Sequence, residues 1–396
     1  MKRGVLTSKK IYLLSVIIYI LGLPLGLIRL GPLGSALKLL AILPVFVALF
    51  MSKASSFRPP LLKQLIFTIF AAMSMAWSID IEVSYERAIS YLLLWALVFS
   101  GSFFQYDATD LQKIKRAFIW SSRITVIVIL LFAEVINDRL WLKENNFTED
   151  PNYMCMYLAC GVVGSLQTLI QSKWIKSKIV AVAELTIYMW IVLLSGSRGG
   201  LLAILACIIA FLLFYNKQYF TRKVAAVVIS GILFLILLNY LPEALRMRFA
   251  VEEVAESGGT GRVAIWEQAI DLHINSDVFR MLFGYGTATI KKSFALYGYP
   301  KELVAHNMFL ETLVELGSIG LILYSAAITS FVRAAKNESD KFAFAVIIGM
   351  FVMSLSTSIY TFKPYFNIML FITILGASHT NRMDALKPRH NVTAVK

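Results

Sequence analysis

Long apolar runs recur along almost the whole chain, and they limit what it can fold into. A helix that crosses the hydrocarbon of a bilayer needs about 20 apolar residues. Charged residues make up only 16% of the 396 residues, whereas soluble domains contain about one quarter. We therefore predict an all-α polytopic membrane protein with about 12 transmembrane helices. The predicted spans are residues 11–30, 36–51, 61–77, 88–104, 117–136, 151–171, 177–196, 199–215, 223–241, 306–332, 342–360 and 364–379.

The predicted spans leave one sizeable segment outside the membrane, residues 242–305, between the ninth and tenth spans. We expect this long loop to contain an amphipathic helix through Val263–Ile270, capped by Thr260 or a neighbour, that lies on the membrane or on the bundle. Residues 1–380 then form a single integral membrane domain, and 381–396 form a polar cytoplasmic tail. The first run lacks a small-residue cleavage site, so we interpret it as a retained span rather than a signal peptide.

The lysines and arginines are unevenly divided between the two sides. Of the 38 cations, 23 fall in seven short segments on the side of the termini, and seven lie in the long loop. Because positive residues concentrate in cytoplasmic loops, both termini are predicted to be cytoplasmic and the long loop to lie outside. The net charge of +14 is then a signal of membrane topology, and nucleic-acid binding is not predicted.

Arg198 lies between two apolar runs, in Ser195–Leu201, at the predicted outer surface. An arginine in or near a bilayer usually faces water, a partner charge or a bound anion. Glycines at 196, 199 and 200 leave backbone N–H groups accessible beside the guanidinium, which favours an anion site. The alternative is an arginine that extends its charge to the interface without any ligand.

Arg262 follows a glycine-rich stretch, Ser257–Gly261, at the start of the predicted loop helix. A glycine-rich turn at a helix N-terminus suits phosphate. The stretch is not a P-loop, because it lacks Gly-Lys-Ser/Thr and does not follow a strand. A turn without a ligand remains the alternative.

His306 begins the tenth predicted span at the outer surface. The helix dipole and nearby arginines disfavour the imidazolium there, and a neutral imidazole is what a general base requires. An ordinary interfacial histidine is the alternative. On the same helix, Asn307, Glu311 and Glu315 share one face, and we expect the two carboxylates to find partners that hold the helix in place.

Asp150-Pro151-Asn152 opens the sixth predicted span. Asp150 suits an N-cap and Pro151 the first helical turn, while Asn152 is placed to touch a substrate in an outer cavity. The cysteines Cys155, Cys160 and Cys207 lie within apolar runs and are interpreted as packing residues.

Three motifs together resemble the O-antigen polymerase/ligase family, bacterial membrane glycosyltransferases that use polyprenyl-diphosphate-linked glycans. They are Ser195–Gly200, the Gly261–Trp266 segment of the long loop, and His306-Asn307 followed by Glu315–Gly320. The resemblance implies a metal-independent transfer on the outer face of the membrane. By this analogy Arg198 and Arg262 hold the donor diphosphate, and His306 serves the acceptor hydroxyl. We also assign Gly199, Asn152 and Asn307 to the substrate site.

The leading interpretation is a polysaccharide repeat-unit polymerase in the bacterial cytoplasmic membrane. The alternatives are an O-antigen ligase that moves polymer to lipid A-core and, less favoured, a transporter or flippase, which should place charges along a central pathway. No Asp-x-Asp cluster lies in the outer segments, so no essential metal and no cofactor are predicted. The expected partners are the lipid-linked donor, the acceptor glycan and membrane lipid, and a flippase and a chain-length regulator are candidate partners.

Overall fold

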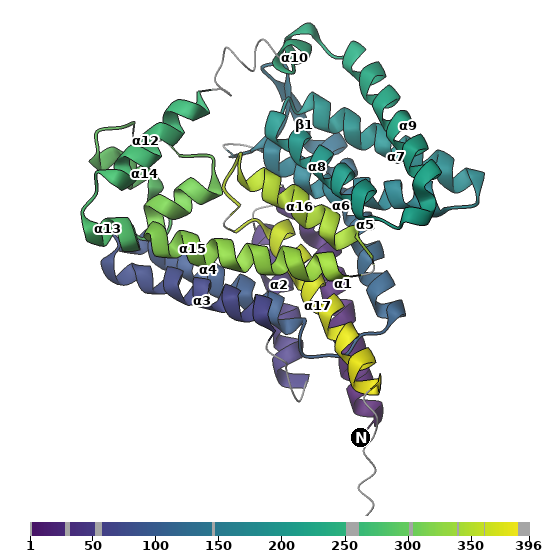
Figure 1. Ribbon diagram of the computed structural model, residues 1–396, viewed down its shortest axis with the longest axis horizontal. Coiled ribbons are helices and arrows are strands. Elements are labelled where there is room, and N and C mark those ends of the chain that lie inside the picture. Colours follow the sequence, from purple (N-terminus) through teal and green to yellow (C-terminus); the bar gives the residue numbers. More distant parts are fainter. Residues whose placement is uncertain are drawn as a thin grey trace, which may run out of the picture.

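The computed structural model describes residues 2–27, 32–51, 58–144, 147–250, 261–300, 304–338, 340–359 and 361–386. Helices dominate it (Figure 1), and one lies at each of the twelve predicted ranges. These long helices are α1 (Lys2–Gly22), α2 (Pro32–Met51), α3 (Pro59–Met73), α4 (Ile81–Ser100), α5 (Ala108–Phe132), α6 (Pro151–Gln171), α7 (Ile175–Leu194), α8 (Arg198–Phe214), α9 (Phe220–Asn239), α15 (Met308–Asn337), α16 (Phe342–Ser354) and α17 (Lys363–Leu386).

Within the described residues, six helical stretches are long and apolar enough to cross a membrane. The chain is therefore a polytopic membrane protein. Spanning by the other long helices stays a prediction, although three of them contain shorter apolar stretches. The six stretches are Ser8–Leu27, Pro59–Trp77, Pro151–Gln171, Ile175–Leu194, Phe220–Asn239 and Met308–Asn337.

A small antiparallel sheet follows α5, where the sequence predicted a continuing helix. The helix ends at Phe132, and the strands β1 (Ala133–Ile136), β2 (Arg139–Glu144) and β3 (Phe147–Glu149) pair in the order β1-β2-β3. Asn137 and Asp138 form the two-residue turn with φ of 50° and 60°, as favoured hairpin turns require. The predicted span 117–136 therefore extends past the end of the helix, because the apolar residues of β1 continue the preceding run and hide the turn, while the predicted all-α class is confirmed for the rest of the described chain.

The ends of the other elements also differ from the predicted ranges in places. Short 3-10 helices η1 (Leu23–Leu27), η2 (Ser74–Trp77) and η3 (Lys217–Tyr219) flank long helices. α17 continues to Leu386, past the predicted start of the tail at 381, and residues 387–396 lie outside the described part of the chain.

The described residues of the long loop form the short helices α10 (Glu243–Arg248), α12 (Arg262–Ile274), α13 (Val278–Phe283) and α14 (Ile290–Leu296). The predicted loop helix is α12, and its predicted cap Thr260 lies outside the described residues. A second hydrophobic cluster joins α12 and α14 to the start of α15, so the loop packs on the bundle. Its buried members are Ala269, Leu272, Tyr285, Ile290, Phe294 and Val314.

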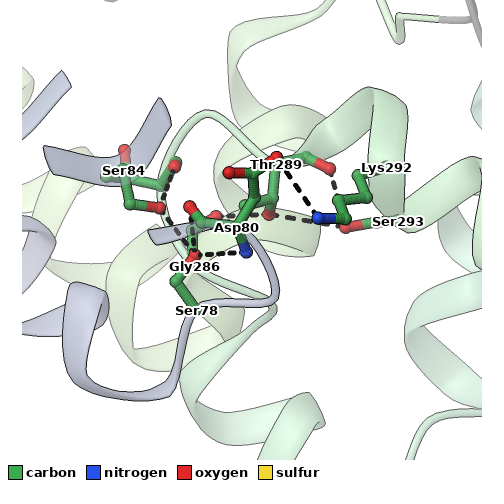
Figure 2. A network of polar contacts seen from close by, with 8 residues as sticks. Ser78, Asp80, Ser84, Gly286, Thr289, Lys292 and Ser293 are labelled. Carbon is green, nitrogen blue, oxygen red and sulfur yellow. Dashed lines mark hydrogen bonds and ion pairs between the residues drawn. The ribbon is translucent and has the colours of Figure 1, made fainter. Parts of the chain in front are cut away.

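A polar network fastens the loop to the connection between α3 and α4 (Figure 2). Ser84 donates to the carbonyl of Thr287 at 2.6 Å, and its hydroxyl lies 2.7 Å from that of Ser78. Lys292 pairs with Asp80 at 3.3 Å. Because the loop carries Arg262, this fastening helps to set where that arginine lies.

Two glycines let the loop cross α15 at backbone contact. Gly284 and Gly317 have φ of 72° and 66°, with ψ of −167° and −171°, a region essentially restricted to glycine. The crossing opens α15, and the carbonyls of Val314 and Glu315 accept hydrogen bonds from Tyr285 and Gly286 at 3.1 and 2.8 Å.

Gly284→Ala is expected to destabilise the protein by about 2–5 kcal/mol, because backbone strain adds to a clash. A Cβ at Gly284 would lie 2.3 Å from the backbone of Glu315. The matched control is Gly298→Ala, which also has positive φ, 83°, but meets nothing within 4 Å. Thermal unfolding in detergent should show a clearly larger loss for Gly284→Ala, and equal losses would contradict the crossing.

Candidate functional site

A cavity of about 620 Å³ lies at one end of the bundle, in the range of ligand pockets. It forms where β2, the starts of α6, α8 and α12, the end of α10 and the α16–α17 connection meet. The polar residues that line it include Arg139, Asp150, Asn152, Ser197, Arg198, Arg248, Arg262 and Ser356. We call it the arginine cavity.

Four arginines from four different elements line this cavity: Arg139 of β2, Arg198 of α8, Arg248 of α10 and Arg262 of α12. Asp150 is the one acidic residue among the described residues that line it. Four cations against one carboxylate leave an excess of positive charge, and such an arrangement is stabilised when an anion binds.

The electrostatics show that the guanidinium groups act on one another. Burial lowers the pKa of Arg139, and the charge of Arg248 lowers it further. Burial also lowers the pKa of Arg262; Asp150 opposes this and Arg198 adds to it. Arginine stays protonated despite such shifts, so the cavity keeps its positive charge.

Arg198 is held at the first residue of α8 by hydrogen bonds to the backbone. Its Nε donates to the carbonyl of Arg248 at 2.6 Å, and the Nε of Arg248 donates to the carbonyl of Gly196 at 3.4 Å. Gly196 adopts a φ of 59°, which glycine reaches without strain. The start of α8 and the end of α10 are thus tied together, which brings two of the arginines to one cavity.

The adjacent glycines serve close packing. A Cβ at Gly199 would lie 2.2 Å from the Oγ of Ser356, and one at Gly200 would lie 2.6 Å from the Sγ of Cys155. The N–H of Gly200 donates to Ser197, the N-cap of α8, at 2.9 Å. Gly199 lines the cavity as the sequence suggested, whereas the N–H of Gly200 is already used within the protein.

Asn152 lines the cavity but is anchored inside the protein. Asp150 caps α6 and accepts from both the backbone N–H and the side-chain amide of Asn152, each at 2.8 Å. The side-chain oxygen of Asn152 accepts from the hydroxyl of Ser197. These contacts lock the start of α6 to the start of α8.

Arg139 and Arg248 were not predicted as site residues from the sequence. Arg139 donates from Nε to the carbonyl of Ser195 at 2.9 Å, and its guanidinium lies 4.9 Å from the ring centroid of Trp141. A signal for Arg139 was available in the turn residues Asn137-Asp138, which place it at the start of a strand. For Arg248 we find no such local signal.

His306 lies just before α15 rather than within it, because Asn307 is the N-cap. The side chain of Asn307 accepts from the N–H groups of Phe309 and Leu310 at 3.0 and 3.3 Å. His306 has a φ of 49°, uncommon for a residue with a side chain. Its N–H donates to Glu311 at 3.1 Å, which holds this backbone conformation.

The ring of His306 is half-buried. It does not line the arginine cavity, but charged residues of that cavity act on its pKa. Burial lowers its pKa, Arg262 lowers it further, and Asp150 opposes the shift. The neighbouring Ala305 accepts a hydrogen bond at 2.9 Å from Trp266, which itself lines the cavity. Burial and Arg262 thus favour the neutral imidazole over the imidazolium.

Glu311 and Glu315 are 2% and 1% exposed, and both find internal partners. Glu315 accepts from the N–H groups of Ala288 and Ile290 at 2.8 and 3.2 Å. Glu311 accepts from His306 and from the hydroxyl of Ser358. These contacts fit the predicted structural role.

A match to a protein-family model supports the resemblance that the motifs indicate. Residues 183–325 match the family described as O-Antigen ligase, and this range includes Arg198, Arg262 and His306. A comparison with curated protein sequences gives no match. A solved structure described as "Structural coordination of polymerization and crosslinking by a peptidoglycan synthase complex" is 14% identical with a TM-score of 0.47, covering 83% of this chain and 98% of that chain. The resemblance of the motifs to the O-antigen polymerase/ligase family is thus supported over residues 183–325, about a third of the chain.

Proposed function

We propose that the protein is a polysaccharide repeat-unit polymerase. It transfers glycan from a polyprenyl-diphosphate-linked donor to a sugar hydroxyl of an acceptor, and it uses no catalytic metal. The observation that carries the proposal is the convergence of four guanidinium groups on one cavity, with a single carboxylate among the described residues that line it. A diphosphate matches this charge, and planar guanidinium groups bind phosphate oxygens in pairs.

The chemistry follows from the arrangement. The acceptor oxygen attacks the anomeric carbon of the donor sugar, the new C–O bond forms, and the bond from that carbon to the diphosphate oxygen breaks. The diphosphate leaves with the electron pair, and the arginines stabilise its developing charge, a role of preorganised electrostatics. The acceptor proton passes to the neutral ring of His306. The arginines thus supply the charge stabilisation that a metal gives in other transferases.

Two alternative functions remain as second candidates. The matching family model is described as a ligase, which favours transfer of finished polymer to lipid A-core. A transporter is less favoured, since the arginines gather at one end of the bundle and not along a path through it.

Purified lipid-linked repeat unit distinguishes these functions. A polymerase should convert it alone into a ladder of longer products in proteoliposomes. A ligase should give product only when a lipid A-core acceptor is added. Movement of intact donor across the bilayer without a new glycosidic bond would overturn both enzyme proposals.

The orientation is part of the proposal: the arginine cavity faces the outside of the cytoplasmic membrane, and both termini lie in the cytoplasm. The cation distribution supports it. In Figure 1 the N-terminus and the end of α17 are both at the bottom of the view, away from α10 and α12.

Cysteine labelling tests this orientation in a variant without the three buried native cysteines. A membrane-impermeant thiol reagent should label Asn275→Cys in intact cells, and it should label Lys173→Cys only after permeabilisation. Both positions are exposed. Labelling with the opposite pattern would invert the topology and exclude an extracytoplasmic site.

A further inference from the structure

A second cavity of about 400 Å³ lies beside the arginine cavity. Its lining includes Arg87, Lys291, Lys363, Tyr153, Tyr157 and Phe362. We propose that this second cavity binds the acceptor saccharide and selects one that carries an acidic group, such as a uronic acid. This inference rests on the proposed function and adds the substrate class of its acceptor.

The charge of the cavity favours an acidic saccharide. Among the described residues that line it, the cations are Arg87, Lys291 and Lys363, and the carboxylates are Glu311 and Glu315. Both carboxylates are buried and already accept hydrogen bonds from protein N–H or hydroxyl groups. The cations therefore outnumber the carboxylates, and an anionic group on the ligand balances the excess.

Lysine and hydroxyl groups also lie close together in this cavity. A Cβ placed at Gly26 would be 3.7 Å from the Nζ of Lys363 and 3.8 Å from the hydroxyl of Tyr157. An ammonium donor and a hydroxyl near each other can bind a carboxylate and a sugar hydroxyl of one residue.

Aromatic rings give the cavity an apolar wall. The rings of Tyr153 and Phe362 stack with centroids 5.0 Å apart, and Tyr157 meets Phe362 edge-on at 5.5 Å. A few polar groups placed on an aromatic wall are typical of small-molecule sites, and the C–H face of a pyranose suits such a wall. The mixture of cations and aromatic rings fits a sugar acid better than an isolated inorganic anion.

The position of the cavity suits an acceptor. Asn152 lines the arginine cavity, and the next residue, Tyr153, lines the second cavity. In the α16–α17 connection, Ser356 lines the arginine cavity and Ser358 lines the second. The backbone N–H of His306 donates a hydrogen bond to Glu311 of the second cavity. The positive charge of Arg262, in the arginine cavity, lowers the pKa of the His306 ring. A sugar in the second cavity therefore lies across His306 from the donor diphosphate.

Saturation-transfer NMR on the full-length protein in detergent tests the inference with two probes, methyl β-D-glucuronide and methyl β-D-glucoside. The glucuronide is expected to bind at least tenfold more tightly than the glucoside. Lys363→Gln and Lys291→Gln should each weaken glucuronide binding about tenfold, the loss of one charge-assisted hydrogen bond of about 1.4 kcal/mol.

Matched controls separate the second cavity from its surroundings. Lys292→Gln removes the adjacent lysine, which pairs with Asp80 and does not line the cavity, and it should bind glucuronide like the wild type. Arg262→Gln should also retain binding. Lys291 is exposed, so Lys291→Gln is expected to fold, and thermal unfolding of the variant should be measured to check this.

Several outcomes would overturn the inference. They are absence of glucuronide binding to the wild type, equal binding of the two glycosides, and unchanged binding in the folded Lys291→Gln and Lys363→Gln variants. Failure of the proposed function looks different: the glucuronide would still bind as described, while lipid-linked donor would give no glycosidic product.

Discussion

Replacement of His306 by glutamine is expected to lower turnover by about 100- to 10,000-fold, the usual contribution of a general base. Glutamine keeps a hydrogen-bonding side chain of similar reach but cannot take the proton of the acceptor hydroxyl. Donor binding should persist, because the four arginines remain. The measurements are polymer formed from lipid-linked repeat unit and binding of that donor to the purified variant.

A matched control is available in His273, another half-buried histidine, whose ring lies 3.4 Å from the hydroxyl of Ser318. His273→Gln should retain turnover, because burial alone lowers the pKa of His273, whereas the charge of Arg262 also acts on His306. If His306→Gln folds and turns over within about tenfold of the wild type, the loss is too small for a base. His306 would then orient the acceptor at most.

The pH dependence of turnover provides a second measurement. Burial and the charge of Arg262 lower the pKa of His306, so the neutral, active form persists to lower pH than for an ordinary histidine. The acid limb of the pH–rate profile should therefore fall below about pH 6.5, the unperturbed histidine value. Arg262→Gln removes a nearby positive charge and should raise the pKa of His306, which an NMR titration of the imidazole measures without any need for turnover.

The sequence predicted the helices well because a membrane demands long apolar runs. Its errors came where a polar turn interrupts such a run. Residues 133–136 are apolar enough to extend the fifth predicted span, yet the Asn137-Asp138 turn makes them a strand. Hydropathy measures how readily residues transfer into lipid, and it does not show where the chain turns. The hairpin at the end of α5 was therefore not predicted.

The candidate site could be predicted only in part. Arg198, Arg262 and Asn152 line one cavity, and each was found from a local motif, a glycine-rich turn or an N-cap. Arg139 and Arg248 lack such a motif, and they reach the cavity through contacts between distant segments, Arg139 with Ser195 and Arg248 with Gly196. These contacts depend on tertiary structure, which no spacing in the sequence reveals.

The roles of short polar side chains were also hard to predict. The substrate role of Asn307 stays a prediction, and in the structure its side-chain oxygen caps α15. The same residue types serve as caps and as ligands, so the sequence alone does not separate the two uses.

Arg198→Ala and Arg262→Ala are each expected to abolish detectable polymer, with a loss of at least about 100-fold, comparable to removal of one preorganised charge-stabilising donor. Both guanidinium groups line the cavity proposed for the diphosphate, and the loss of either reduces the positive charge that stabilises the leaving group. Arg198→Lys should rescue poorly, because an ammonium cannot make the planar paired contact with phosphate.

Arg139→Ala and Arg248→Ala extend this prediction to the two arginines that only the structure identified. Both line the same cavity, so each should weaken donor binding and lower polymer formation. Arg246→Ala is the matched control for Arg248→Ala, because Arg246 lies on the same helix α10, is exposed, and does not line the cavity.

Polymer yield, donor binding and thermal unfolding should be measured for all five alanine variants. Near-normal polymer in a folded Arg198→Ala or Arg262→Ala variant would remove that residue from the site. Equal effects of Arg246→Ala and Arg248→Ala would show that net charge of the outer surface, rather than the cavity, binds the donor.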